Sequence, residues 1–477
     1  MRFVITLRNI TFLAFRLFAL STAVLLGLAQ SAPAQSPTPT GCSHCTEIFP
    51  ANKPINDLGQ ETYYPTGSPS PSPSTTPVQG GLYPGGFNQR PIAHNNRGIR
   101  IAQTKIVPRK RDGSPDPDGT DPQSKIVMIS IGMCNTSKEF GGNLGVDEEQ
   151  GFEWRVMQDF FASLWRNPKL VVIDCAQSEM GANKWAHPIN LDPWVELESR
   201  LHDARVTRKQ VQIIWLKQAL AQPANWGVWP THAKNLQGFL ETILNRLVDR
   251  NFAYALKNVQ MVFLSSRTRA WTLDDEGYHH SPEPYAYETG FAAKWLIEEQ
   301  INPGVQGWPW LSWGPYIWTD GMNERSDHFT WLCSDVVRDC MHPSNDGVRK
   351  VSDQLLAFFK TDPVARPWFL KTPDHPPTNV NVTIDDDDGT IDAGTTVNFQ
   401  ASATPYGTRT IAEYVWTYDD GDYAYGQDVT KAFPASSQSG NPYNVHLTVI
   451  DNEGDAAFQD KLITVNPTPT LTPTPTP

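Results

Sequence analysis

The chain has 477 residues, enough for two or three domains, and a formal net charge of −12 at pH 7. This acidic balance argues against a nucleic-acid partner, because binding to phosphates needs clustered Lys and Arg. The 16 Trp and 14 Tyr residues suit a large core, and they also suit a carbohydrate groove in which flat rings cover sugar faces.

Residues 1–34 are predicted to be a secretory signal peptide. Arg2, Arg8 and Arg16 form a basic n-region, Leu17–Ala29 is apolar, and the small residues 32–34 provide a cleavage site. The apolar stretch is shorter than the roughly 20 residues that span a bilayer. We therefore expect a secreted or cell-surface protein with no membrane span in the mature chain.

Residues 35–80 are rich in Pro, Ser, Thr and Gly, as in the alternating Ser-Pro run 68–73. Such a composition buries little apolar surface, so it predicts a disordered linker. The next segment, as far as Ser124, is less biased. We place it as an N-terminal extension of a domain that spans residues 81–371.

Apolar runs and amphipathic stretches alternate from Ile126 to Phe359. The predicted strands are Ile126–Ile131, Leu170–Ile173, Val211–Leu216, Val259–Leu264 and, more weakly, Trp310–Trp318. The predicted helices are Glu148–Trp165, Trp194–Ala204, Ala233–Arg250, Tyr285–Ile301 and Val348–Phe359. Continuous apolar strands that alternate with helices predict an α/β fold, a doubly wound, flavodoxin-like parallel sheet covered on both faces. Sites in such sheets gather at the carboxyl ends of the strands. The residues at those ends are Cys134, Cys175, Lys217, Gln218, Ser265 and Ser266.

A Pro-rich boundary at residues 372–378 separates this domain from residues 376–466, which have a different pattern. Apolar and polar residues alternate there with period two, as in Val380–Ile384 and Tyr443–Val449. This pattern predicts a small antiparallel, immunoglobulin-like β-sandwich. Residues 467–477 form a Thr-Pro repeat, which predicts an extended tail.

Two short segments suggest a catalytic centre. Gly132-Met133-Cys134-Asn135-Thr136 directly follows the first predicted strand, and Asp339-Cys340-Met341-His342-Pro343 precedes the last predicted helix. An Asp three residues before a His can hold the imidazole in one tautomer, which leaves the other ring nitrogen to act as a base. The sequence therefore predicts a triad of Cys134, His342 and Asp339, in which Cys134 is the nucleophile.

The sandwich resembles a PKD (polycystic kidney disease) domain. That family has a Trp-Asp-Phe-Gly-Asp-Gly motif and a later Tyr-x-Val-x-Leu-x-Val-x-Asp-x-x-Gly motif. This chain has Trp416-Thr417-Tyr418-Asp419-Asp420-Gly421 and then Tyr443–Gly454 in the matching order. The resemblance implies a spacer or adhesive module of secreted proteins.

The larger domain resembles the SGNH (GDSL-type) hydrolase superfamily over about 250 residues. Asp339–Pro343 fits the last family block, whereas Gly132–Thr136 departs from Gly-Asp-Ser-x-Thr by having Cys in place of Ser. The family also supplies a Gly after the second strand and an Asn after the third. The resemblance therefore implies oxyanion-binding roles for Gly181 and, as a replacement for Asn, for Gln218.

We predict hydrolysis of ester bonds, with acyl groups on extracellular polysaccharide as the substrate class and with no cofactor and no metal ion. Two other functions remain open. One is a catalytically inactive carbohydrate-binding or adhesion protein, and the other is a thiol-dependent acyltransferase or peptidase that uses the same Cys and His.

Alternative roles also remain open for individual residues. In an exported chain, cysteines are expected in disulfides. The pairs considered are Cys42–Cys45, which is favoured over a metal site there, Cys333–Cys340 beside the histidine, and Cys134–Cys175, which would remove the nucleophile. Asp339 and His342 can also be read as a helix cap and a surface turn, and Thr136 or Ser137 as a cap or a nucleophile. Glu283 and Glu288 are either helix-start acids or substrate contacts, and Asp385–Asp388, Asp419, Asp420 and Asp422 are either turn acids or calcium ligands.

Overall fold

The structure, a computed structural model, describes Cys45 and residues 53–63, 78–142, 148–271, 281–302, 307–385 and 388–467. The predicted signal peptide and all but the first residue of the Thr-Pro tail lie outside these residues. No helix in these ranges is long and apolar enough to cross a membrane.

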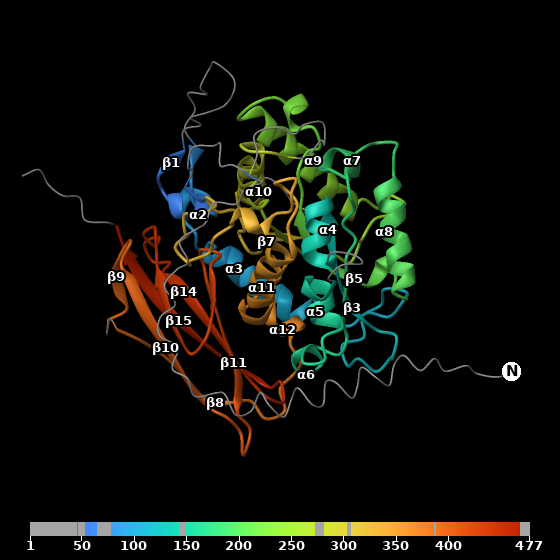
Figure 1. Ribbon diagram of the computed structural model, residues 1–477. Helices are drawn as coiled ribbons and strands as arrows, with labels where there is room; N and C mark the ends of the chain where they lie inside the picture. Colours follow the sequence, from blue (N-terminus) through green and yellow to red (C-terminus); the bar gives the residue numbers. More distant parts are fainter. Residues whose placement is uncertain are drawn as a thin grey trace, which may run out of the picture. The chain divides into compact units, whose positions relative to one another are not determined.

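A parallel sheet forms the centre of the larger domain (Figure 1). Its strands are β3 (Ile126–Gly132), β4 (Leu170–Ile173), β5 (Val211–Lys217), β6 (Met261–Leu264) and β7 (Trp310–Trp313). They lie in the order β4-β3-β5-β6-β7, and every neighbouring pair is parallel. In chain order this is 2-1-3-4-5, the order of flavodoxin-like sheets. The parallel α/β sheet predicted from the sequence is thus confirmed.

Helices cover both faces of this sheet. They are α3 (Ile92–Thr104), α4 (Cys134–Gly141), α5 (Phe152–Met157), α6 (Ala162–Trp165), α7 (Ala182–Trp185), α8 (Asp192–Asp203), α9 (Thr231–Val248), α10 (Tyr285–Ile301), α11 (Asn345–Thr361) and α12 (Arg366–Phe369). Val127 and Ile129 of β3 pack in one apolar cluster with α8, α9 and α10. Ile126 and Met128 pack in another cluster with α5, α11 and α12. The strand is buried on both sides, which explains its unbroken apolar sequence.

The helix predicted over Glu148–Trp165 is interrupted in the structure. A short 3₁₀ turn (Glu148–Gln150) precedes α5, and α6 begins only at Ala162. Between α5 and α6 the Asp159 carboxylate accepts a hydrogen bond from the Phe161 amide at 2.9 Å. Asp and Asn side chains that bond to nearby amides compete with helix formation, so the acid ends this helix.

Part of the stretch predicted as a disordered linker has a defined structure. It contains α2 (Ile55–Leu58) and the antiparallel pair β1 (Thr62–Tyr63) and β2 (Val78–Gln79). Ile55 is fully buried, and its amide donates a hydrogen bond to the Tyr316 hydroxyl at 3.0 Å. The Tyr287 hydroxyl donates to the Lys53 carbonyl at 2.9 Å. A few apolar residues inside a Pro- and Ser-rich stretch are enough to attach residues 53–63 to the larger domain.

The C-terminal region is a β-sandwich, coloured orange to red in Figure 1. One sheet has the order β13-β10-β8 and the other β12-β11-β14-β15-β9. The strands are β8 (Thr378–Ile384), β9 (Thr390–Asp392), β10 (Thr396–Thr404), β11 (Ile411–Tyr418), β12 (Tyr423–Tyr425), β13 (Asp428–Ala432), β14 (Tyr443–Asp451) and β15 (Ala456–Asn466). Their pairs are antiparallel except β15–β9, which is parallel. The predicted β-sandwich is confirmed, with this one difference in strand direction.

The sandwich and the larger domain share a core. Ile450 and Ala456 belong to the same apolar cluster as residues of α11 and α12. At the edge of this contact the Thr448 hydroxyl donates to the Lys360 carbonyl at 3.0 Å, and Lys360 Nζ lies 2.6 Å from the Glu413 carboxylate.

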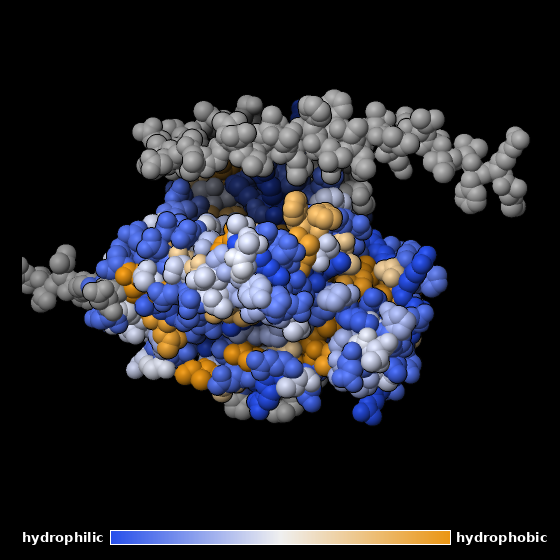
Figure 2. Space-filling model, turned by 90° about the horizontal axis from the view of Figure 1, so that it is seen from below, coloured by the Kyte–Doolittle hydropathy of each residue, from blue (hydrophilic) through white to orange (hydrophobic). Residues whose placement is uncertain are grey.

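Hydrophilic residues predominate on the face shown in Figure 2, where apolar residues form small separate patches.

Candidate functional site

The segment with the predicted nucleophile, Gly132–Thr136, forms a tight turn from β3 into α4 and is here called the nucleophile segment. A side chain at Gly132 would lie 2.2 Å from the Thr136 hydroxyl and 2.5 Å from the Lys217 carbonyl. Because Gly132 has none, Thr136 folds back over the strand end and donates to that carbonyl at 2.8 Å. The spacing of Gly132 and Thr136 therefore fixes the turn that presents Cys134. Thr136 is neither the cap nor the nucleophile that the sequence left open.

Cys134 is the first residue of α4 and carries a free thiol. It is buried, as is Cys175, the other free cysteine in the described part of the chain. The disulfide considered between these two residues is not formed, so the Cys134 thiol is free. A helix N-terminus favours negative charge, which suits a thiolate at this position.

Residues Asp339–His342 form a compact turn, here called the histidine turn, which the Asp339 side chain holds together. Asp339 Oδ1 accepts hydrogen bonds from the amides of Met341 and His342 at 3.0 and 2.9 Å. Asp339 Oδ2 lies 2.7 Å from His342 Nδ1. The N-cap of the following helix is Ser344, whose hydroxyl accepts from the Gly347 amide. Asp339 is therefore not a helix cap, and its contacts orient the imidazole.

The structure brings Cys134, His342 and Asp339 together, as the sequence predicted. His342 Nε2 lies 2.8 Å from Cys134 Sγ, across a sequence separation of 208 residues. Both ring nitrogens are thus engaged, one with the acid and the other with the thiol. This is the arrangement required for a base that exchanges a proton with a nucleophile.

The charges of this group support one another. Burial raises the pKa of the Cys134 thiol, but the hydrogen bond and charge of His342 and the charge of Arg267 bring it below its ordinary value. Burial lowers the pKa of His342, but its bonds to Asp339 and Cys134 raise it to about 9. Burial raises the pKa of the Asp339 carboxyl group, but its hydrogen bonds with His342 and Met341 outweigh this effect and hold the pKa well below the usual range. The lowered pKa of the thiol and the raised pKa of the imidazole both act in the direction of a thiolate–imidazolium pair.

Cys175 has the opposite environment. Burial, reinforced by the neighbouring Asp174 charge, raises the pKa of its thiol well above the ordinary value. A thiol in that state is a weak nucleophile. Cys175 is therefore a natural internal reference for the reactivity of Cys134.

Three contacts join the segments that form the site. Asn135 Nδ2 donates to the Met341 carbonyl at 2.9 Å, which connects the nucleophile segment to the histidine turn. The Trp271 amide donates to the Cys340 carbonyl at 2.8 Å, and Ala270 and Met341 pack in one apolar cluster. The segment that follows β6 therefore lies against the histidine turn. Asn135 was not predicted as a site residue from the sequence. The signal that could have identified it is its position directly after Cys134.

Cysteine pairing differs from the pairs considered from the sequence. Cys45 forms a disulfide with Cys340, with a Cα–Cα distance of 5.7 Å. Both the Cys42–Cys45 and the Cys333–Cys340 pairs are therefore wrong. Cys333 is also disulfide-bonded. The local spacing of the cysteines misled the prediction because the N-terminal segment returns to the histidine turn across 295 residues of sequence.

Gly181 and Gln218 lie next to each other, as their proposed common role requires. Gln218 Nε2 donates to the Met180 carbonyl at 3.3 Å, and Gln218 Oε1 is buried without a hydrogen-bond partner. Ala219, the next residue, packs against Cys134. The Gly181 amide, however, donates to the Glu179 carbonyl at 3.1 Å and is engaged in this structure. Their oxyanion-binding roles remain a prediction.

A buried ion pair underlies the site. Lys217 at the end of β5 contacts Glu139 of α4, and both side chains are almost fully inaccessible to solvent. Burial lowers the pKa of Lys217 to about 8, although the charge of Glu139 acts in the opposite direction. Burial also raises the pKa of Glu139. The pair ties α4 to the central strand and thereby supports the helix that carries Cys134.

The remaining polar candidates near the strand ends have structural partners. The Ser137 hydroxyl donates to Asp174 at 2.6 Å, so it is neither a cap nor a nucleophile. Glu283 accepts hydrogen bonds from the Ala270 and Tyr287 amides and from Trp318 Nε1. Glu288 lies 2.7 Å from His232. These acids position the backbone and side chains around them.

Comparison with known proteins identifies the C-terminal region. A PKD domain family profile matches residues 379–465. Residues 379–465 are a PKD domain. The PKD1 domain from the Vibrio cholerae metalloprotease PrtV is 21% identical with a TM-score of 0.16, over 19% of this chain and 98% of that chain. The PKD1 domain of Vibrio anguillarum Epp is 17% identical with a TM-score of 0.15, over 19% and 96% of the two chains.

For the larger domain the comparisons give much less. An endo-β-1,4-mannanase from Thermotoga petrophila aligns over 72% of this chain and 79% of its own, with 9% identity and a TM-score of 0.13. That similarity is too low to show a common fold. No curated protein matches the chain.

The acids of the PKD domain motif are neutralised within the protein. Lys431 Nζ lies 2.7 Å from Asp420 Oδ2 and also contacts Asp422. Asp419 accepts hydrogen bonds from the amide and side chain of Asn444. These contacts give each of the three acids a partner within the protein. Asp385 accepts from the amide and side chain of Asn398, whereas Asp386 and Asp387 lie outside the described residues.

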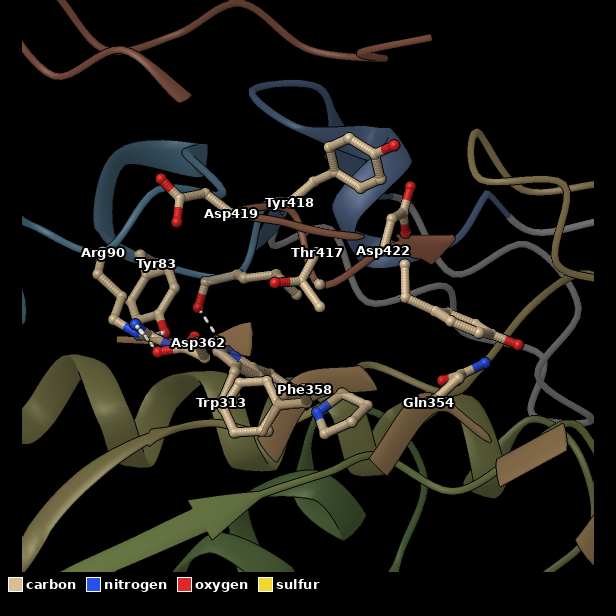
Figure 3. Close-up of a pocket in the computed structure, with 15 residues that line it drawn as sticks. Tyr83, Arg90, Trp313, Gln354, Phe358, Asp362, Thr417, Tyr418, Asp419 and Asp422 are labelled. Carbon is tan, nitrogen blue, oxygen red and sulfur yellow. Dashed lines mark hydrogen bonds and ion pairs between the residues drawn. The ribbon is translucent and has the colours of Figure 1, made fainter. Parts of the chain in front are cut away.

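The PKD domain and the larger domain also line a small cavity between them, shown in Figure 3. Arg90 and Asp362 form a buried ion pair on its wall, with Arg90 Nη1 3.1 Å from Asp362 Oδ1. The cavity volume is about 20 Å³, which is room for a water molecule and not for a sugar ring. The cavity is therefore a feature of domain packing.

Proposed function

We propose that the larger domain hydrolyses ester bonds, with Cys134 as the nucleophile, His342 as the proton carrier and Asp339 as the residue that orients it. The observation that carries the proposal is the continuous set of contacts from thiol to imidazole to carboxylate, at 2.8 and 2.7 Å. The free state of Cys134 and the lowered pKa of its thiol support the same role.

The reaction follows from these contacts. The Cys134 thiolate, whose proton is on His342, attacks the ester carbonyl and forms a tetrahedral oxyanion. The C–O bond then breaks, the leaving alcohol takes the proton from His342, and a thioester remains. His342 next removes a proton from water, which attacks the thioester. The acid departs, and Cys134 returns to its starting state.

The oxyanion of both tetrahedral steps needs hydrogen-bond donors. The backbone amide of Cys134, at the N-terminus of α4, is the first we assign to it, because helix N-termini present amides to negative charge. The side-chain amide of Gln218, whose neighbour Ala219 packs against Cys134, is the second; Nε2 has two N–H groups, and one of them donates to the Met180 carbonyl. Loss of one such donor costs about 3–4 kcal/mol of barrier.

We further propose membership of the SGNH superfamily and, as substrates, acyl groups on extracellular polysaccharide. The parallel sheet order and the Asp-x-x-His-Pro turn at the entry of α11 support the family assignment. The PKD domain and the predicted signal peptide support an extracytoplasmic location and a polymeric substrate. The substrate class is an inference by analogy.

The decisive experiment measures hydrolysis of p-nitrophenyl acetate by five proteins. The wild type and Cys134→Ser are expected to turn over, whereas Cys134→Ala and His342→Ala are expected to be inactive. Cys175→Ala is the matched control, because it removes the other free thiol outside the triad, and it should retain activity. Absence of turnover in the wild type with a reduced, alkylatable Cys134 would refute hydrolysis. Transfer of the acyl group to an added amine in preference to water would replace it with acyl transfer.

A further inference from the structure

Arg267 differs from the other buried arginines of this protein. Arg90 contacts Asp362, Arg269 lies 2.9 Å from Asp320, and Arg325 lies 2.7 Å from Asp327. Arg267 is only 3% exposed, but its guanidinium has no hydrogen bond or ion pair with the residues that the structure describes, and Nε is buried without a partner. A buried guanidinium that lacks a counter-ion is costly, so it calls for an explanation.

The position of Arg267 places it at the candidate site. It follows the carboxyl end of β6, and its amide donates to the Thr289 hydroxyl at 2.9 Å. The segment that begins with it continues to Ala270 and Trp271, which contact the histidine turn. Arg267 is also close enough to Cys134 for its charge to lower the pKa of the thiol.

The acids around Arg267 are already committed elsewhere. Burial lowers the pKa of Arg267, and the charges that oppose this effect are those of Cys134, Glu139, Glu283 and Asp339. Glu139 contacts Lys217, Asp339 contacts His342, and Glu283 accepts three hydrogen bonds from neutral donors. Among the described residues, therefore, none supplies a counter-ion to the guanidinium, and its donors are available to a ligand.

We propose that Arg267 binds a carboxylate of the substrate beside the scissile ester, so that the enzyme prefers anionic esters. The planar guanidinium matches a carboxylate through two parallel hydrogen bonds. The carboxylate has two chemical sources: the acyl group itself, as in a succinyl hemiester, or an acidic sugar that carries a neutral acyl group. This inference rests on the proposed ester hydrolysis for its substrate class, but the anion site can be tested separately.

The first test does not depend on hydrolysis. Cys134 is alkylated with iodoacetate or iodoacetamide; in both cases the Sγ–C bond forms and iodide leaves. The ratio of the two rates is compared among the wild type, Arg267→Met and Arg267→Lys. The ratio of iodoacetate to iodoacetamide is expected to fall roughly 10- to 100-fold in Arg267→Met, which is the contribution of one charged hydrogen-bonded pair. Arg267→Lys should retain part of the preference for iodoacetate.

Arg338→Met is the matched control, because it removes an exposed positive charge one residue from Asp339, and it should leave the ratio unchanged. A ratio in Arg267→Met equal to that of the wild type overturns the anion site. So does an equal fall in the control, which would show a general surface field. The Met side chain keeps the length of the buried stem, and Arg267→Gln serves as a second variant whose ratio must agree.

The second test names the source of the carboxylate. The KM of the wild type for p-nitrophenyl hemisuccinate should be roughly tenfold or more below that for the acetate, if the acyl group carries the charge. Acetylated polyuronate should be preferred over acetylated neutral mannan if the sugar carries it. In either case Arg267→Met should abolish the difference in KM between the charged and the neutral member of the pair. Equal wild-type use of charged and neutral members of both pairs overturns the proposal, whereas no hydrolysis of any ester with an intact iodoacetate preference refutes only the hydrolase function.

Discussion

Cys340, which lies two residues before His342, forms a disulfide with Cys45 across a sequence separation of 295 residues. The bond therefore ties the N-terminal segment to the turn that carries Asp339 and His342, the acid and the base of the proposed triad. The turn has few other anchors, among them the hydrogen bonds from Trp271 and Asn135.

Removal of this disulfide is expected to affect both stability and activity. Replacing Cys45 and Cys340 together by Ser should lower the free energy of unfolding by about 2–5 kcal/mol, because a large loop of the unfolded chain is no longer closed. The looser histidine turn should also lower kcat. Urea unfolding and ester hydrolysis of the same samples check both effects. An unchanged midpoint of unfolding would show that packing alone holds the turn.

Replacing Asp339 by Asn should lower kcat about 10²- to 10⁴-fold with little change in KM. The amide no longer stabilises the imidazolium, and it favours the wrong tautomer of His342. Steady-state kinetics check this. Asp346→Asn is the control, because Asp346 is an exposed acid in the first turn of α11. Equal losses in both variants would contradict a specific role for Asp339.

The pH dependence of kcat/KM should be bell-shaped. On the acid side, activity should rise as Cys134 loses its proton, at a pH below that of an ordinary thiol because the pKa is lowered. On the basic side, it should fall as His342 loses its proton near its pKa of about 9. The two values belong to the pair, and they are read from initial rates between about pH 4 and pH 10. Asp339→Asn should move the basic limb to lower pH, since Asp339 raises the pKa of His342. A basic limb that stays in place would argue against their coupling.

Lys431→Met should destabilise the protein by about 3–5 kcal/mol, because it leaves Asp420 buried without its counter-charge and removes one of the two cations beside Asp422. Lys53→Met provides the comparison: Lys53 pairs with Glu61, and the two side chains are 56% and 61% exposed. Its loss should cost less than about 1 kcal/mol. Calorimetry of both variants checks the difference, and similar costs would mean that the buried acids are protonated or hydrated.

The sequence predicted those elements whose pattern is local. β4 and α10 have the predicted bounds, because a short apolar run and a long periodic stretch each identify themselves. The triad was predictable because each half of it lies within five residues. The PKD domain followed from its two motifs.

The features that the sequence did not predict depend on contacts between distant segments. Ile55 and its neighbours are packed by Tyr316 and Tyr287, which no local pattern connects with a Pro-rich stretch. The pairing of Cys45 required knowing where the N-terminal segment returns. Arg267 is one of 39 Lys and Arg residues, and only the absence of an acid beside it in the described structure distinguishes it.

The shared core of the PKD domain and the larger domain has a practical consequence for anyone who divides this protein at its Pro-rich boundary. Cutting there would uncover Ile450 and Ala456 on one fragment and the facing residues of α11 and α12 on the other. Newly uncovered apolar surface promotes aggregation. A shortened protein made for kinetic work should therefore retain its C-terminal sandwich or replace those contact residues with polar ones.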